Sequence, residues 1–233
     1  MKFSSTILVY SITLLTTSFA LHAENNLEGP YVGIDLGYLD GTENGNEKNS
    51  GVDAGFHFEA KPKGFGLGLA LGYDKILSDK FLIGAEIAGY RFKNADDRTT
   101  PYNDNAINNG PGYTTNTYKI DLKYKLETKL KAGVVFNEKK SSIYILGGVG
   151  AAKIERTYTT IAEGDYNNND WTYGTLFGFG SEHLVSDNIS LKIEHIISNY
   201  GEEKINTNAS WANTKQYMDL NDSTTHVGLQ YRF

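Results

Sequence analysis

Charged residues spaced two apart are the feature of this sequence that could do chemistry. Alternate positions between residues 119 and 131 carry Lys119, Asp121, Lys123, Lys125, Glu127, Lys129 and Lys131. In a β-strand, residues two apart point to the same face, so these charges would form a ladder along one side. Such a ladder could pair with carboxylates in a buried interior, or it could line an ion-conducting pore.

The segment 116–131 also has to be tested against a helix. Leu122, Leu126 and Leu130 are four apart, a spacing that suits one helix face. A helix would scatter the neighbouring tyrosines and isoleucine around its circumference, whereas a strand collects all the apolar residues opposite the charges. The pattern therefore predicts a strand with one apolar face, made of Tyr118, Ile120, Leu122, Tyr124, Leu126 and Leu130.

The elements that would position this ladder repeat along the whole chain. Apolar and small residues alternate in eight blocks: 31–39, 65–76, 81–92, 116–136, 143–157, 171–185, 189–200 and 224–233. Short connectors (77–80, 137–142 and 186–188) alternate with long polar segments (40–64, 94–115, 158–170 and 201–223). This is typical of short periplasmic turns and long external loops. The sequence predicts an all-β fold, an eight-stranded antiparallel up-and-down transmembrane β-barrel.

The long polar segments are predicted to be mobile external loops. Turn-forming residues are concentrated in them, as at 44–46, 103–105, 108–110 and 167–170. They contain little apolar surface to bury, and functional surfaces often lie on such loops over a rigid scaffold. Aromatic residues within the loops, such as Tyr102 and Trp211, could anchor a partner or pack on one another.

The start of the chain indicates export. Lys2 precedes an apolar stretch from Ile7 to Ala20, and small residues follow, with cleavage expected after Ala23 or after Ala20. We therefore expect a signal peptide at 1–23 and a single outer-membrane β-barrel domain at 24–233. The absence of Cys excludes disulfides, thiolate metal sites, cysteine catalysis and lipid attachment through Cys. A net charge of -6 makes nucleic acid an improbable partner.

Sorting the strands by parity predicts an interior charge network. It contains eight acidic and eight basic residues: Asp35, Asp74, Glu86, Lys119, Asp121, Lys123, Lys125, Glu127, Lys129, Lys131, Lys153, Glu155, Glu182, Lys192, Glu194 and Arg232. An eight-stranded barrel has a lumen that side chains just fill, so buried charges there need partners. The network could be a salt-bridged plug that closes the barrel, or the lining of a narrow pore for ions or small solutes.

Several segments resemble one family of bacterial surface proteins. His226, Gly228, Tyr231 and Phe233 have the spacing of the C-terminal assembly signal of outer-membrane proteins. The segment 31–38 (YVGIDLGY) resembles the opening strand of the opacity-type, OmpA-like eight-stranded barrels, and 146–153 (LGGVGAAK) resembles their fifth strand. The segment 184–194 followed by 198–201 is similar to their turn and Tyr-Gly region, although the family's usual aromatics are missing at His195 and Ile197.

This resemblance implies a barrel in the bacterial outer membrane with a structural or surface-antigen role. Long external loops would suit adhesion or host interaction, sometimes with a porin role. The implied partners are outer-membrane lipid and lipopolysaccharide, the barrel-assembly machinery during insertion, and a host-surface receptor for the loops.

His195 and Ser198 are the candidates for hydrolytic chemistry, because lipid A deacylases are eight-stranded barrels that use a His and a Ser. Residues three apart in a strand point to opposite faces, which argues against a joint site. His57, His183 and His226 lie far apart without metal-ligand spacing. We expect no enzyme, no metal and no cofactor, with a lipid A hydrolase as a minor alternative.

Overall fold

The computed structural model describes residues 26–49, 52–99, 102–103, 117–160, 164–205 and 214–233. Its strands are β1 (Gly29–Asn49), β2 (Val52–Ala60), β3 (Lys63–Leu77), β4 (Phe81–Thr99), β5 (Tyr102–Asn103), β6 (Thr117–Phe136), β7 (Ser141–Thr160), β8 (Gly164–Ser186), β9 (Ile189–Ile205) and β10 (Thr214–Arg232). In the part of the chain that the structure describes, no helix is long and apolar enough to cross a membrane. The predicted signal peptide lies outside the described residues.

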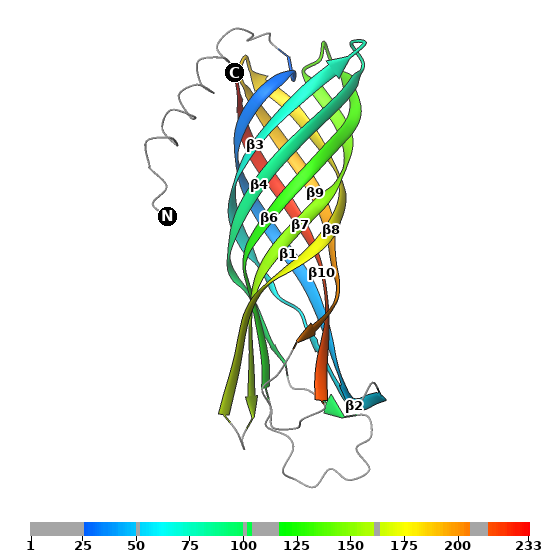
Figure 1. Ribbon diagram of the computed structural model, residues 1–233. Coiled ribbons are helices and arrows are strands. Elements are labelled where there is room, and N and C mark those ends of the chain that lie inside the picture. Colours follow the sequence, from blue (N-terminus) through cyan, green and yellow to red (C-terminus); the bar gives the residue numbers. More distant parts are fainter. Residues whose placement is uncertain (1–25, 50–51, 100–101, 104–116, 161–163, 206–213) are drawn as a thin grey trace, which may run out of the picture.

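Eight of the strands form a closed antiparallel ring. The order is β10-β9-β8-β7-β6-β4-β3-β1, and β1 pairs with β10 to complete the circle. The closing register runs from Tyr31 opposite Arg232 to Asn49 opposite Thr214. The strands wind steeply around the barrel, with the three tight turns and the carboxyl terminus at one end (Figure 1). The predicted eight-stranded up-and-down barrel is therefore confirmed.

The part of the ring nearest the tight turns is apolar on its outer surface. Along β3 the side chains alternate between exposed and buried, so Leu69 is 68% exposed while Ala70 is 2% exposed. Every ring strand continues this exposed apolar band, including Ile34, Ile87, Leu130, Ile145, Phe177, Ile193 and Leu229. A surface of this kind avoids water and suits contact with lipid. We call this part the membrane ring.

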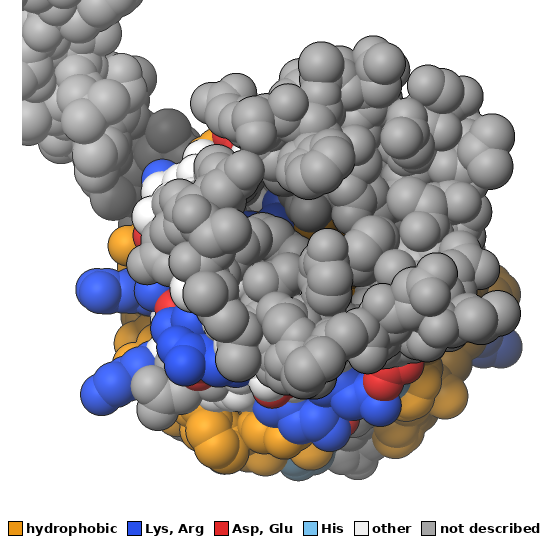
Figure 2. Space-filling model, turned by 90° about the horizontal axis from the view of Figure 1, so that it is seen from below, with side chains coloured by type: hydrophobic (Ala, Val, Ile, Leu, Met, Phe, Trp, Pro, Cys, Tyr) orange, Lys and Arg blue, Asp and Glu red, His pale blue; other side chains and the backbone are white. Residues whose placement is uncertain are grey.

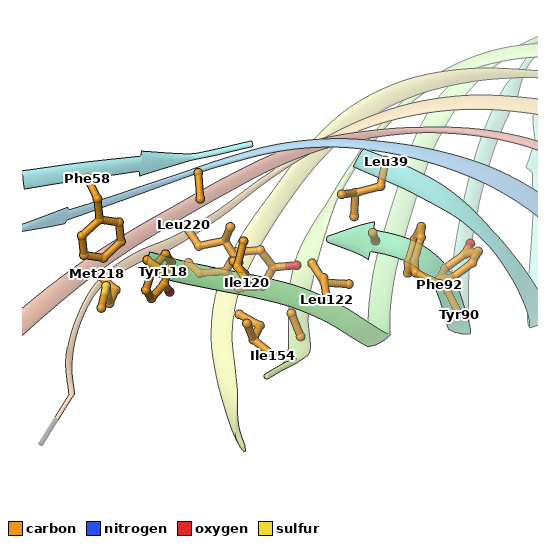
Figure 3. Packing of buried hydrophobic residues seen from close by; sticks show 14 of the residues in the cluster. Leu39, Phe58, Tyr90, Phe92, Tyr118, Ile120, Leu122, Ile154, Met218 and Leu220 are labelled. Carbon is orange, nitrogen blue, oxygen red and sulfur yellow. The ribbon is translucent and has the colours of Figure 1, made fainter. Parts of the chain in front are cut away.

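Beyond the membrane ring, the same strands continue into a wall whose interior is apolar. Leu39, Phe58, Tyr118, Ile120, Leu122, Ile154, Met218 and Leu220 pack together inside it (Figure 3). The rings of Phe58 and Tyr118 lie 4.1 Å apart. Its outward side chains are largely polar, such as Asp40 and Lys119. We call this part the external wall, because long extensions of barrel strands lie outside the cell.

The external wall corrects the prediction that the long polar segments are mobile loops. Asn44–Asn46 lies within β1, and Asn167–Asp170 lies within β8. The sequence did not predict β2, which pairs with Glu43–Asn49 after β3 has left the side of β1, nor β5, which pairs with β2. Cross-strand hydrogen bonding thus satisfies backbone groups that a free loop would leave to water. The predicted turn-forming segment 108–110 lies outside the described residues, as do Asn105 and Trp211.

A β-bulge at Lys123 changes the direction of the side chains along β6. The pairing of β6 with β7 shifts between Leu122 and Tyr124, so Lys123 is the extra residue. Before the bulge Ile120 and Leu122 point inward, and after it Tyr124 points outward. The expectation that 118–130 has one continuous apolar face is therefore wrong. The strand has two apolar stretches, one facing the interior of the wall and one facing lipid.

Candidate functional site

The interior of the membrane ring is filled by ion pairs arranged in layers. The layer nearest the tight turns is built on Arg232, which contacts Asp74 at 2.9 Å and Glu182 at 2.5 Å. Lys131 lies 2.9 Å from the same Asp74 and donates to the Tyr31 hydroxyl at 2.9 Å. Each charge is shared between strands distant in sequence, so this layer ties β1, β3, β6, β8 and β10 together.

The middle layer is built on two lysines among carboxylates. Lys129 lies 2.7 Å from Glu86 and 2.8 Å from Glu194. Lys192 lies 3.1 Å from Glu86 and 3.3 Å from Asp35. All five side chains have no exposed surface. Such charges are tolerated in a dry interior only because each has partners of opposite sign.

Glycines make room for these charges at two places. A Cβ on Gly228 would lie 1.9 Å from the Asp35 carboxylate, and a Cβ on Gly84 would lie 2.0 Å from that of Asp74. Both distances are far below contact, so any side chain at these positions would displace the carboxylate. The inward glycines therefore shape the network instead of leaving an open channel.

The outer layers lie where the membrane ring meets the external wall. Lys125 lies 2.8 Å from Asp222 and 3.2 Å from Glu127. Further out, Arg156 donates to Glu43 from two nitrogens, at 2.8 and 2.6 Å. Both nitrogens donate to the same Glu43 oxygen, Oε1, which holds the guanidinium in one position as well as pairing its charge.

Tyr118 completes the outermost layer. Its hydroxyl donates to Glu43 at 2.5 Å, inside the apolar core of the wall. Burial and the neighbouring Glu43 carboxylate hold the pKa of the Tyr118 hydroxyl well above its usual range. The hydroxyl therefore remains protonated and keeps its role as a donor.

Eleven of the sixteen sequence-predicted network residues lie buried inside the barrel: Asp35, Asp74, Glu86, Lys125, Glu127, Lys129, Lys131, Glu182, Lys192, Glu194 and Arg232. The prediction is wrong for the other five, Lys119, Asp121, Lys123, Lys153 and Glu155, which lie on the outer surface. On β6 the bulge at Lys123 reverses the direction of the side chains before it, so Lys119, Asp121 and Lys123 point outward. On β7 the buried positions from Ser142 onward are even-numbered, so Lys153 and Glu155 point outward between Ala152, Ile154 and Arg156.

Glu43, Arg156 and Asp222 were not predicted as part of the network: Glu43 and Asp222 lie in segments taken for loops, and Arg156 lies in the predicted strand 143–157 on the face taken as outward. With them, the buried charges of the described residues number eight carboxylates and six lysines or arginines. The interior is therefore richer in negative charge than the predicted equal balance. The hydroxyls that bridge the charges were also not predicted. These hydroxyls donate to buried carboxylates: Tyr31 to Glu86, Tyr90 to Asp35, and Tyr144 to Glu194. The inward face predicted for the blocks 31–39 and 81–92 was the available signal for Tyr31 and Tyr90, whereas the face assigned in the block 143–157 placed Tyr144 outward.

His195 and Ser198 lie on opposite sides of β9. His195 is on the outer surface, where it contacts Thr225 at 3.0 Å, while Ser198 is buried and accepts from Lys125 at 3.2 Å. The two side chains therefore do not form a joint site. In the described part of the chain, no group of three or more His, Asp or Glu residues is placed to hold a metal ion.

Three residues of the predicted assembly signal lie on the two faces of β10, and the fourth, Phe233, follows the strand. His226 is buried with its ring 4.4 Å from that of Tyr90, and Gly228 also points inward. Tyr231 points outward and meets Phe233 edge-on at 5.2 Å. Recognition of these residues during assembly remains a prediction.

A closed ring with an apolar outer band and an ion-paired interior defines an integral outer-membrane β-barrel protein. The chain belongs to the outer membrane protein beta-barrel domain family, which matches residues 11–233. No curated protein matches the chain.

Solved structures share the fold at low sequence identity. The outer membrane protein OprG from Pseudomonas aeruginosa is 13% identical with a TM-score of 0.58, over 90% of this chain and 98% of that chain. The outer membrane protease OmpT from Escherichia coli is 13% identical with a TM-score of 0.50, over 88% and 97%. Neisserial surface protein A (NspA) is 13% identical with a TM-score of 0.45, over 88% and 97%. At this identity, these likenesses concern the fold alone.

Proposed function

We propose that this protein is a non-enzymatic surface protein of the bacterial outer membrane, which holds its external segments at a distance from the bilayer for adhesion or host interaction. Its membrane ring acts as a closed anchor and its external wall as a rigid support. The observation that carries the proposal is the length of the strands. The ring strands have 15 to 23 residues, whereas crossing a bilayer takes about 9–11.

The construction of the wall supports a display role. Its apolar core and the strand pairing around it, which is interrupted between β8 and β9 in the described residues, make it stiffer than a set of loops. The connecting segments 104–116 and 206–213 follow directly from its strands. A partner that approaches the cell would meet the far end of the wall before it met the lipid. Functional surfaces on rigid scaffolds commonly lie at such ends.

The interior supports a closed anchor over a narrow porin. Lys129, Lys192, Glu86 and Glu194 occupy the middle of the ring with no exposed surface. A continuous water path there would require breaking several buried ion pairs at once, which is costly because each leaves an unpaired charge.

Cell binding tests the display role. Bacteria that produce the full chain should bind host cells or matrix more strongly than a strain without it. Replacing 104–116 and 206–213 with short Gly-Ser linkers should abolish the gain, whereas replacing the turn 137–140 at the opposite end should not. Equal binding by the linker variant would contradict the proposal.

Planar-bilayer recordings test the closed anchor. The purified protein should give no conductance steps above baseline. Reproducible single-channel steps would favour the porin alternative. Unchanged lipid A in cells that overproduce the protein is expected, and its deacylation would favour a hydrolase.

A further inference from the structure

Two cations and two aromatic residues form one row on the outer surface where the membrane ring meets the external wall. Arg91 on β4 pairs with Tyr124 on β6, Tyr124 with Lys153 on β7, and Lys153 with Trp171 on β8. The four strands are neighbours in the ring, so these side chains stand side by side at roughly 5 Å intervals. The Arg91 guanidinium lies 6.0 Å from the centre of the Tyr124 ring.

An apolar groove lies next to this row on its membrane side. The next outward positions on the same strands are Gly89, Leu126, Ala151 and Tyr173, again paired in register. Gly89 has no side chain, so the surface is hollowed beside Leu126, and both residues line the groove. The groove has a volume of about 780 Å³ and extends over β3 to Leu67 and Leu69 and over β1 to Ile34.

The two cations at the edge of the groove are available to a ligand. Lys123, one step further out, is held by Asp121 at 2.5 Å and Glu155 at 3.3 Å. Within the described ranges, no carboxylate oxygen lies within 4.0 Å of the charged nitrogens of Arg91 or Lys153. From the external end, Lys and Arg side chains are seen gathered at the rim beside hydrophobic surface (Figure 2).

A second apolar groove provides an internal comparison. It lies nearer the tight turns and is lined by residues such as Gly133, Ile145, Phe179 and Ile193. Lysine and arginine are absent from its described lining, where His195 is the one ionisable group besides Tyr144. An apolar groove with two cations at its edge therefore occurs at the level of the outer leaflet, whereas the groove nearer the tight turns has no such cations in its described lining.

We propose that the outer groove binds one molecule of the phosphorylated, multi-acyl lipid of the outer leaflet, the lipid A part of lipopolysaccharide. Its acyl chains would lie against Leu69 and Leu126, and its phosphates would be held between Arg91 and Lys153. Arginine suits this role because its planar fork donates two hydrogen bonds to one phosphate. The lysine stem can lie on the apolar surface while its ammonium reaches the headgroup. This site does not depend on the proposed display function.

Native mass spectrometry of the full-length barrel in detergent tests this site. Titration with purified lipid A should load one lipid per barrel, and lipid A with both phosphates removed should bind at least tenfold more weakly. Phosphatidylglycerol should also bind at least tenfold more weakly. Equal binding of all three lipids would overturn the proposal.

Variants separate the charges from the groove. Arg91→Gln combined with Lys153→Gln should weaken lipid A binding at least tenfold. Gly89→Leu should do the same by filling the hollow while keeping both charges. The matched control, Lys80→Gln combined with Lys140→Gln, removes two cations at the opposite end and should change binding less than twofold.

Heat-modifiable migration on gels checks that each variant is folded. All three variants should retain it, because the substituted side chains lie outside the packed interior. Equal weakening by the test and control pairs would overturn the proposal in favour of general electrostatic attraction. Unchanged binding by Gly89→Leu would overturn the assignment of the groove.

Discussion

The membrane ring and the external wall use largely the same strands in opposite ways. In the ring, apolar residues such as Leu69 and Leu130 face outward, and the interior is charged. In the wall, Ile120 and Leu122 face inward, and outward positions are polar. The difference follows from the solvent on the outside, which is lipid in one region and water in the other. Most strand pairs continue across the boundary, but β8 and β9 separate beyond Thr175 and Asn199, and β6 carries the bulge at Lys123.

The largest expected effect comes from deleting Lys123, the bulge residue of β6. The deletion would turn Tyr118, Ile120 and Leu122 outward and would bring Lys119 and Asp121 into the wall. Losing the burial of three large side chains should cost the wall about 5 kcal/mol or more, at roughly 1.5–3 kcal/mol each.

Hydrogen exchange should then show loss of protection in the wall, with the membrane ring still protected. Lys123→Ala keeps the residue count and should leave the wall intact. Native protection of the wall in the deletion variant would mean that the bulge does not cause the reversal of side-chain direction between the wall and the ring.

Removing a central cation should have the next largest effect, this time on the ring. Lys192→Met leaves Asp35, Glu86 and Glu194 with too little positive charge in a dry interior. We expect a loss of about 3–5 kcal/mol in the free energy of unfolding, measured with urea in lipid vesicles.

The matched substitution is Lys61→Met, since Lys61 pairs with Glu59 at the exposed surface of the wall. It should cost less than about 1 kcal/mol. Similar costs for the two variants would indicate that the interior of the ring is hydrated.

Placing the same charge on the outside of each region sharpens the comparison further. Leu130 is 67% exposed on the outer surface of the ring, near the middle of the apolar part of β6. Leu130→Lys should destabilise the barrel by roughly 2–4 kcal/mol in vesicles, because the ammonium would enter lipid. Thr157→Lys, on the outside of the wall, should change stability by less than about 0.5 kcal/mol. A tolerated Leu130→Lys would contradict the placement of the membrane.

The smallest effect is expected at a tight turn, where Asp79 lies 2.7 Å from Lys139. The hydrogen bond and charge of Lys139 lower the pKa of the Asp79 carboxyl below its usual 3.8. The pair therefore stabilises the turn above that value and stops doing so as the pH falls through the lowered pKa. A side-chain NMR titration should show the lowered midpoint, and Lys139→Gln should return it toward 3.8. An unchanged midpoint in the Lys139→Gln variant would show that the ion pair does not cause the lowered pKa of Asp79.

The sequence predicted the ring well and the wall poorly, and β6 shows why. Across the bulge at Lys123 the side chains reverse direction, and at the same level the preferred location of apolar residues reverses from inside to outside. The two reversals cancel, so apolar residues stay at even positions from Tyr118 to Leu130. The alternation looks uninterrupted although it crosses between two environments. No count of alternating residues could reveal that change.

β7 shows the opposite case, a strand without a bulge against β8. Its outward apolar residues, such as Ile145 and Val149, are odd-numbered, and the inward ones of the wall, such as Ile154, are even-numbered. The pattern changes phase between Ala151 and Ala152, and this change was a readable sign of the boundary. Glu43 was harder to find, because an isolated charge in a polar segment gives no sign of a buried partner 113 residues away. Its partner Arg156 lies in the predicted strand 143–157, whose inward face was assigned to Lys153 and Glu155 instead.

The seam between the first and last strands has a consequence for how the molecule is made. Arg232 donates to the Leu27 carbonyl across 205 residues of sequence, so the layer nearest the tight turns forms only when both β1 and β10 are in place. Until then the chain has two unpaired strand edges and charged side chains without partners of opposite sign. Unpaired strand edges can pair with other chains. A chain without the β10 edge should therefore form a sheet that cannot close and that associates with other chains.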